Sequence, residues 1–364
     1  MYVLRRIVAP MKLFQTSLFV AALSLFAVLQ AQPIPNGTTI YASGLEGPRG
    51  LAFGPDGLLY VAEAGLGGNQ PVPAGCEGTP PPVGPYSGGP SARVSRIEAN
   101  GTRTTVIDGL PSAISSLPSG DTQGVAAVAF HGDNLFVLLA GGGCSHGNPM
   151  APNGLIRIDT KKGTAELIAD LSAFFRQNPV AHPNPGDFEP DGTPYSMKVV
   201  DGHFIVVEAN HGRLLSINPG GHIDQLTDTS ATLGHIVPTS AAWKDGFFYV
   251  GNLGGFPAQV GAEKLYKITK HGEIIGFLDG FTTVVGVETD ALGRLYVLEL
   301  SAANGFPAPF AGRIVRLSGS GAEVILDGLI VPTAMTIGPD GAIYVSDLGA
   351  AAGSGGRILR FVAP

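Results

Sequence analysis

The chain has 364 residues, and its 29 Asp and Glu outnumber its 22 Lys and Arg, which gives a formal net charge of −7. An acidic chain lacks the basic surface that nucleic-acid phosphates require, so its composition argues against nucleic-acid binding. Its 44% apolar and 14% charged residues, with 53 Gly and 29 Pro, indicate one sheet-rich globular domain with many turns.

Residues 1–31 predict a secretory signal peptide. Lys12 precedes an apolar run at 18–29, and Ala31 is a small residue suited to cleavage. The run is shorter than the roughly 20 residues of a membrane-spanning helix, although an uncleaved anchor remains the alternative. We therefore expect a secreted or periplasmic protein.

Cleavage after Ala31 removes three basic residues and no acid, so 19 basic against 29 acidic residues leave a net charge of −10. The chain starts at either Met1 or Met11. Met11-Lys-Leu is the more typical beginning of a signal peptide. The remaining residues, 32–364, are expected to form a single domain and a monomer.

A β-hairpin of one design recurs along the chain. The clearest copies are 50–63 and 334–347, in which an apolar strand, a Pro-Asp-Gly turn and a second strand ending in an acid follow one another. Six residues open the second strand of successive copies: Tyr60, Phe136, Ile205, Tyr249, Tyr296 and Tyr344. Their steps of 76, 69, 44, 47 and 48 residues are typical of a β-propeller with four strands per blade. The sequence thus predicts an all-β, six-bladed propeller.

The two ends of the chain predict how the ring closes. The last repeat stops after a strand at 357–361, and the segment 38–43 matches its missing fourth strand. Pairing them leaves no unpaired edge in the last blade. The two long steps arise from segments 65–90 and 170–194, which we interpret as loops, the second beginning with a short helix.

The two cysteines, Cys76 and Cys144, fall in loops between the second and third strands of neighbouring blades. Such loops share one face of a propeller, so we predict a disulfide, which an exported protein tolerates. It would hold the first-blade loop over the mouth of the central tunnel. Two free thiols are the alternative, since sequence does not give the geometry.

Polar residues recur where the second strand of a blade ends. Five of the six equivalent positions carry side-chain oxygens, at Glu63, Glu208, Asn252, Glu299 and Asp347. Carboxylates gathered around one axis repel each other unless their pKa values rise or a cation binds, and Ca²⁺ takes roughly six to eight oxygen ligands. Ca²⁺ binding is one interpretation. In the other, these side chains accept backbone N–H groups of the loops.

Four further residues fall on the same expected face. His211, three residues beyond Glu208, is the first candidate for a general base, and His235 is the second. An exposed loop histidine more often has no chemical role. Arg49 and Tyr195 are candidates to line the tunnel mouth and bind a ligand, with packing or loop anchoring as the alternative.

Several segments resemble exported proteins of the ScyD/ScyE family. They include 44–57 with 60–65, Pro194-Tyr195, 237–240, 295–299 and, most particular, Gly255-Phe-Pro257 with Val260-Gly261. The resemblance implies an NHL-type propeller and a link to the synthesis of scytonemin, a cyanobacterial sunscreen pigment. The architecture is also similar to six-bladed lactonases of the gluconolactonase and paraoxonase type, which hold a divalent metal at the tunnel mouth.

Two functions follow as hypotheses. The first is binding of a small molecule or partner protein at the loop-rich tunnel face, without turnover. The second is a Ca²⁺-dependent lactonase, esterase or lyase, in which the metal polarises a carbonyl and a histidine moves a proton. Binding is favoured because no nucleophile–base arrangement is recognisable in the sequence.

Overall fold

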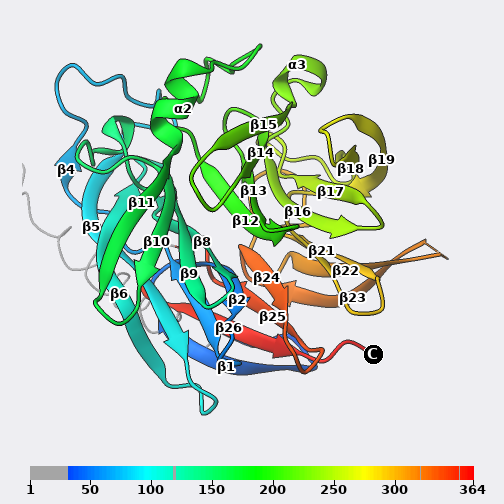
Figure 1. Cartoon of the computed structure of the whole chain (residues 1–364). Helices are drawn as coiled ribbons and strands as arrows, with labels where there is room; N and C mark the ends of the chain where they lie inside the picture. The colour runs from blue at the N-terminus through cyan, green and yellow to red at the C-terminus, as the bar shows by residue number, and fades with distance from the viewer. Residues whose placement is uncertain (1–31, 118–119, 320, 352) are drawn as a thin grey trace, which may run out of the picture. The chain divides into compact units, whose positions relative to one another are not determined.

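Six antiparallel sheets follow one another around a ring in residues Ile34–Pro364 of the computed structural model (Figure 1). The structure describes residues 32–117, 120–319, 321–351 and 353–364, so the predicted signal peptide lies outside the described residues. The prediction of a six-bladed propeller is confirmed. None of the helices in the described ranges is long and apolar enough to span a membrane.

Each blade runs from an innermost to an outermost strand. Blade one contains β2 (Pro48–Phe53), β3 (Leu59–Glu63), β5 (Ser87–Ile97) and β6 (Arg103–Ile114), with the short β4 (Gln70–Pro71) and β7 (Thr122–Gln123) added. Blade two contains β8 (Val125–His131), β9 (Asn134–Leu139), β10 (Gly154–Asp159) and β11 (Thr164–Asp170). Blade three contains β12 (Pro194–Val200), β13 (His203–Glu208), β14 (Arg213–Ile217) and β15 (Ile223–Asp228).

The second half of the ring repeats this order. Blade four contains β16 (Pro238–Lys244), β17 (Phe247–Asn252), β18 (Glu263–Thr269) and β19 (Ile274–Phe281). Blade five contains β20 (Val284–Thr289), β21 (Leu295–Glu299), β22 (Gly312–Ser318) and β23 (Gly321–Leu329). Blade six contains β24 (Ala334–Ile337), β25 (Ile343–Asp347), β26 (Gly356–Phe361) and β1 (Thr38–Leu45). Short helices lie in three connections: η1 (Cys144–His146), α2 (Leu171–Gln177) and α3 (Ser230–Leu233).

The recurring hairpin explains how the blades hold together. The hydroxyl of Tyr60 donates to the turn residue Asp56 at 3.0 Å, and Tyr344 donates to Asp340 at the same distance. The ring of Tyr60 packs edge-on against Phe130 of blade two, with ring centroids 4.8 Å apart. In these two copies the hairpin therefore fixes its own turn, and Tyr60 also contributes an aromatic side chain to the core between blades.

The N-terminal strand closes the ring as predicted. β1 pairs antiparallel with β26, from Thr38 opposite Phe361 to Leu45 opposite Gly356. The inner strands β2 and β24, one from each end of the chain, lie in contact. The ends are thus joined by backbone hydrogen bonds rather than by a covalent link.

One predicted loop contains more structure than expected. Segment 65–90 includes β4 and the start of β5, because β5 and β6 extend beyond the usual blade. The alternation of apolar residues that marks a strand is missing there because glycines pack backbone against backbone. A Cβ on Gly88 would lie 2.6 Å from the carbonyl carbon of Gly147.

Candidate functional site

The five strand-end polar residues are all buried and end β3, β13, β17, β21 and β25 as predicted. Most of them hold the loop that enters their blade. Glu63 accepts the backbone N–H of Glu46 at 2.7 Å, and Asp347 accepts that of Ile330, also at 2.7 Å. Glu208 accepts from Thr193 at 2.8 Å. This is the loop-anchoring role that the sequence left open.

The other two strand-end residues, Glu299 and Asn252, form similar contacts. Glu299 accepts the backbone N–H of Thr282 at 2.5 Å. Asn252 donates to the carbonyl oxygen of Ile236 at 3.1 Å and accepts the backbone N–H of Lys264 at 3.0 Å. Each side chain therefore ties together two or three segments of its own blade.

In four blades the strand-end acid has an arginine of the third strand as a further neighbour. The sequence analysis missed these arginines. Arg93, Arg213, Arg313 and Arg357 stand opposite Glu63, Glu208, Glu299 and Asp347 in the strand register. Arg313 and Arg357 form direct ion pairs with their carboxylates. The signal was present, because each of these four acids is followed in the sequence by an arginine at the matching place of its repeat.

The electrostatics of these acids reflect their burial. Burial raises the pKa of Glu63, Glu299 and Asp347 above the ordinary range, although hydrogen bonds and arginines act in the opposite direction. Their oxygens are already engaged by N–H groups and guanidinium groups. Among the described residues, no group of three or more His, Cys, Asp and Glu side chains is placed to hold a metal ion. The structure thus does not gather these residues around one ion, and Ca²⁺ binding stays a prediction.

The two candidate histidines meet at one loop, residues 187–193, which leads into β12. His235 Nε2 lies 3.0 Å from a carboxylate oxygen of Asp187, and His211 Nε2 lies 2.9 Å from the carbonyl oxygen of Glu189. His211 is buried, not exposed as expected for a loop histidine, with 4% of its surface accessible. Its ring stacks on Phe188, with centroids 5.0 Å apart.

The same loop carries a buried polar network. His146 Nε2 lies 3.2 Å from Glu189, and the hydroxyl of Tyr86 donates to Glu189, also at 3.2 Å. Burial lowers the pKa of His146, but Glu189 and Asp191 outweigh burial, so its pKa is raised overall. Burial raises the pKa of Tyr86 well above its usual value. Loop 187–193 is therefore a structural junction between blades one, two and three.

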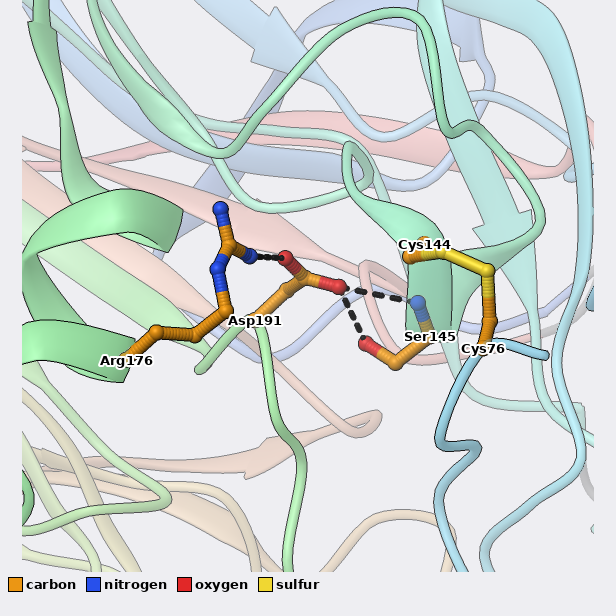
Figure 2. The surroundings of a disulfide bond; sticks show 5 residues. All are labelled: Cys76, Cys144, Ser145, Arg176 and Asp191. Carbon is orange, nitrogen blue, oxygen red and sulfur yellow. Dashed lines mark hydrogen bonds and ion pairs between the residues drawn. A yellow bond between two sulfur atoms is a disulfide. The ribbon is translucent and has the colours of Figure 1, made fainter.

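The predicted disulfide between Cys76 and Cys144 is present, with Cα atoms 5.7 Å apart. Figure 2 shows Asp191 beside it, between Ser145 of η1 and Arg176 of α2. Asp191 accepts the backbone N–H and the hydroxyl of Ser145, both at 2.8 Å, and pairs with Arg176 at 2.8 Å. The disulfide lines a cavity over blades two and three. Neither cysteine lines the tunnel cavity, and the expectation that the bond holds the first-blade loop over the tunnel mouth stays a prediction.

Arg49 and Tyr195 lie together at the start of two inner strands, as the sequence predicted. Both line a cavity of about 60 Å³ on the tunnel axis. Arg49 Nη2 donates to the carbonyl oxygen of Thr122 at 2.5 Å and approaches Asp121 at 3.3 Å. Tyr195 donates to the carbonyl oxygen of Thr333 at 3.2 Å. Burial raises the pKa of Tyr195 to about 12, although Arg49 opposes the shift, so its hydroxyl stays a donor at neutral pH.

Comparisons with known proteins place this architecture among solved propellers. A gluconolactonase from Xanthomonas campestris matches 90% of this chain and 89% of its own, with a TM-score of 0.53 and 10% identity. A Bacteroides thetaiotaomicron protein of unknown function matches 90% of this chain and 76% of its own, with a TM-score of 0.57 and 12% identity. No protein-family model matches the chain, and no curated protein matches it. These likenesses support the propeller fold, and the resemblance to ScyD/ScyE proteins stays a prediction.

Proposed function

We propose that this protein is an exported propeller that binds the polar end of a small molecule at the tunnel mouth, without turnover. The observation that carries the proposal is the convergence of polar side chains from several blades on one axial cavity. Its polar lining residues are Arg49, Gln123, Tyr195, Ser196, Lys198, Ser240, Glu288 and Thr333. A few convergent polar groups in a preformed hollow are the usual composition of a ligand site.

The charges of the cavity favour an anionic or carbonyl group. Lys198 is paired with Glu288, so these two charges offset each other. Arg49 uses Nη2 for its contacts with Asp121 and with Thr122 of β7, and its guanidinium carries further N–H groups in a planar fork suited to a carboxylate. The neutral hydroxyl of Tyr195 lies in the same cavity. We infer that a carboxylate or lactone head enters here.

The size of the cavity limits what enters. About 60 Å³ is well below the roughly 300–1,000 Å³ of a usual small-molecule site, so only the head of a ligand fits and its body would lie among the loops. The disulfide supports export, because such bonds persist in oxidising compartments. The resemblance to ScyD/ScyE proteins makes exported secondary metabolites the first natural compounds to test.

The test is calorimetric titration with gluconate and with glucono-lactone, using wild type, Arg49→Lys and Tyr195→Phe. We expect gluconate to bind and Arg49→Lys to weaken it about tenfold, because the point charge of Lys loses the bidentate contact. Tyr41→Phe, outside the cavity lining, is the matched control and keeps wild-type affinity. Equal affinity in all variants, or no binding, contradicts the proposal. If the wild type hydrolyses the lactone and His211→Ala does not, the hydrolase hypothesis would replace this proposal.

A further inference from the structure

A second cavity lies over blades two and three and shares no lining residue with the tunnel cavity. Its volume is about 670 Å³, within the range of roughly 300–1,000 Å³ that is usual for small-molecule sites. We propose that this cavity binds a neutral aromatic molecule that carries one hydrogen-bond donor. The proposal is independent of the function assigned to the tunnel mouth.

The walls of this cavity are apolar and stiff. Phe175 lies in the last turn of α2, Val180 follows the end of that helix, and Phe188 belongs to loop 187–193. Five prolines complete the lining: Pro149, Pro152, Pro179, Pro183 and Pro190. The disulfide between Cys76 and Cys144 also belongs to the lining. Proline and disulfide walls leave little conformational entropy to lose on binding, so the site is largely preformed.

The charges of the lining disfavour an anion. Asp170 caps α2 by accepting the backbone N–H of Ala173 at 2.7 Å, and Asp191 is held between Ser145 and Arg176. With Glu77 the lining carries three carboxylates and one guanidinium, a balance of −2. A negatively charged ligand would be repelled, whereas aromatic walls favour an uncharged ring.

His211 supplies the specific contact. A carbonyl oxygen only accepts, so the 2.9 Å contact with Glu189 requires the hydrogen on Nε2, and the neutral ring then has an acceptor at Nδ1. Nδ1 is buried and has no hydrogen-bond partner among the described residues. Phe188 covers one face of the ring and Phe175 meets it edge-on, with centroids 5.0 Å apart in both pairs. A buried acceptor without a partner is destabilising, and a ligand O–H or N–H would satisfy it.

The site is tested with two probes, 2-naphthol and 2-methoxynaphthalene. Only 2-naphthol carries a hydrogen-bond donor. We expect 2-naphthol to bind wild type roughly three- to tenfold more tightly, the factor that one hydrogen bond gives. In His211→Phe, which keeps an aromatic ring, the two affinities become equal. Phe188→Ala weakens both probes together, and Tyr195→Phe at the tunnel mouth leaves both unchanged. Circular dichroism melting confirms that each variant is folded.

The outcomes separate this site from the tunnel mouth. Loss of probe binding in Tyr195→Phe with full binding in His211→Phe would overturn the proposal and place the probes in the tunnel. Equal affinities for the two probes in wild type would remove the role of His211. If neither probe shows saturable binding, the proposal is also overturned, regardless of whether gluconate binds at Arg49.

Discussion

Arg357 stands directly opposite Asp347 on β26 and β25, and its Nε lies 2.8 Å from the Asp347 carboxylate. Both side chains are buried, and the other carboxylate oxygen accepts the backbone N–H of Ile330 at 2.7 Å. One ion pair therefore joins two strands of blade six to the loop that enters the blade.

Removal of this arginine should be costly. In Arg357→Met the carboxylate of Asp347 stays buried without its cation, and we expect the free energy of unfolding to fall by about 3–5 kcal/mol. Urea denaturation measures the change. Arg316→Met is the matched control, because its pair with the exposed Glu323 is screened by solvent and should contribute far less. Equal effects in the two variants would contradict a special role for the buried pair.

The disulfide should stabilise the fold substantially. Cys76 and Cys144 are 68 residues apart, so the bond restricts a long loop in the unfolded chain. We expect the double variant Cys76→Ser/Cys144→Ser to lose about 2–4 kcal/mol of unfolding free energy. Dithiothreitol should lower the stability of wild type to a similar level and leave the double variant unchanged. A wild type that is indifferent to the reductant would count against the bond.

Asp191 should make the protein sensitive to acid. Burial alone would raise the pKa of Asp191, but hydrogen bonds from Ser145 and Ser172 and the charge of His146 lower it overall. A lowered pKa contributes stability that is complete above the ordinary Asp pKa of about 4 and is lost as pH falls through the folded-state value.

The test compares wild type with Asp191→Asn by urea denaturation at neutral pH and at about pH 3. The wild type should be the more stable protein at neutral pH, and the difference should shrink in acid. Asp327→Asn is the control, because Asp327 is an exposed carboxylate. A difference that is the same at both pH values would show that Asp191 acts through its shape alone.

Ca²⁺ at the strand-end acids is tested by metal analysis of the purified protein. A calcium ion would have to displace N–H and guanidinium donors from Glu63, Glu208, Glu299 and Asp347. We therefore expect the melting temperature to be the same with and without EDTA. One equivalent of calcium that is released by both Glu208→Gln and Asn252→Ala would reverse this expectation and favour the hydrolase.

Much of the architecture was accessible from sequence because it rests on local chemistry. The strand–turn–strand hairpin repeats with a recognisable spacing, and in its two Pro-Asp-Gly copies the Tyr hydroxyl binds the turn carboxylate. The closing strand was visible because Thr38–Leu45 has the strand-like pattern that the last repeat lacks. The position of the cysteines in equivalent loops was enough to predict their bond.

Pairwise contacts between distant residues were not accessible in this way. The sequence pattern around Glu63 and Asp347 is the same for an acid that binds a metal and for one that accepts a backbone N–H. Only the partners of these side chains in the folded protein distinguish the two roles. Loop 187–193 carried no periodic pattern, although Glu189 and Asp191 connect it to Tyr86, Ser145 and Arg176.

The sequence by itself determined the number of blades, their order and the residues that end each second strand, because these depend on repeats of neighbouring residues. The tertiary structure alone decided that His211 is buried, that the disulfide borders a side cavity and that the strand-end acids are paired. Those outcomes depend on which side chains from separate blades meet in space, and on whether burial leaves a polar atom with a partner.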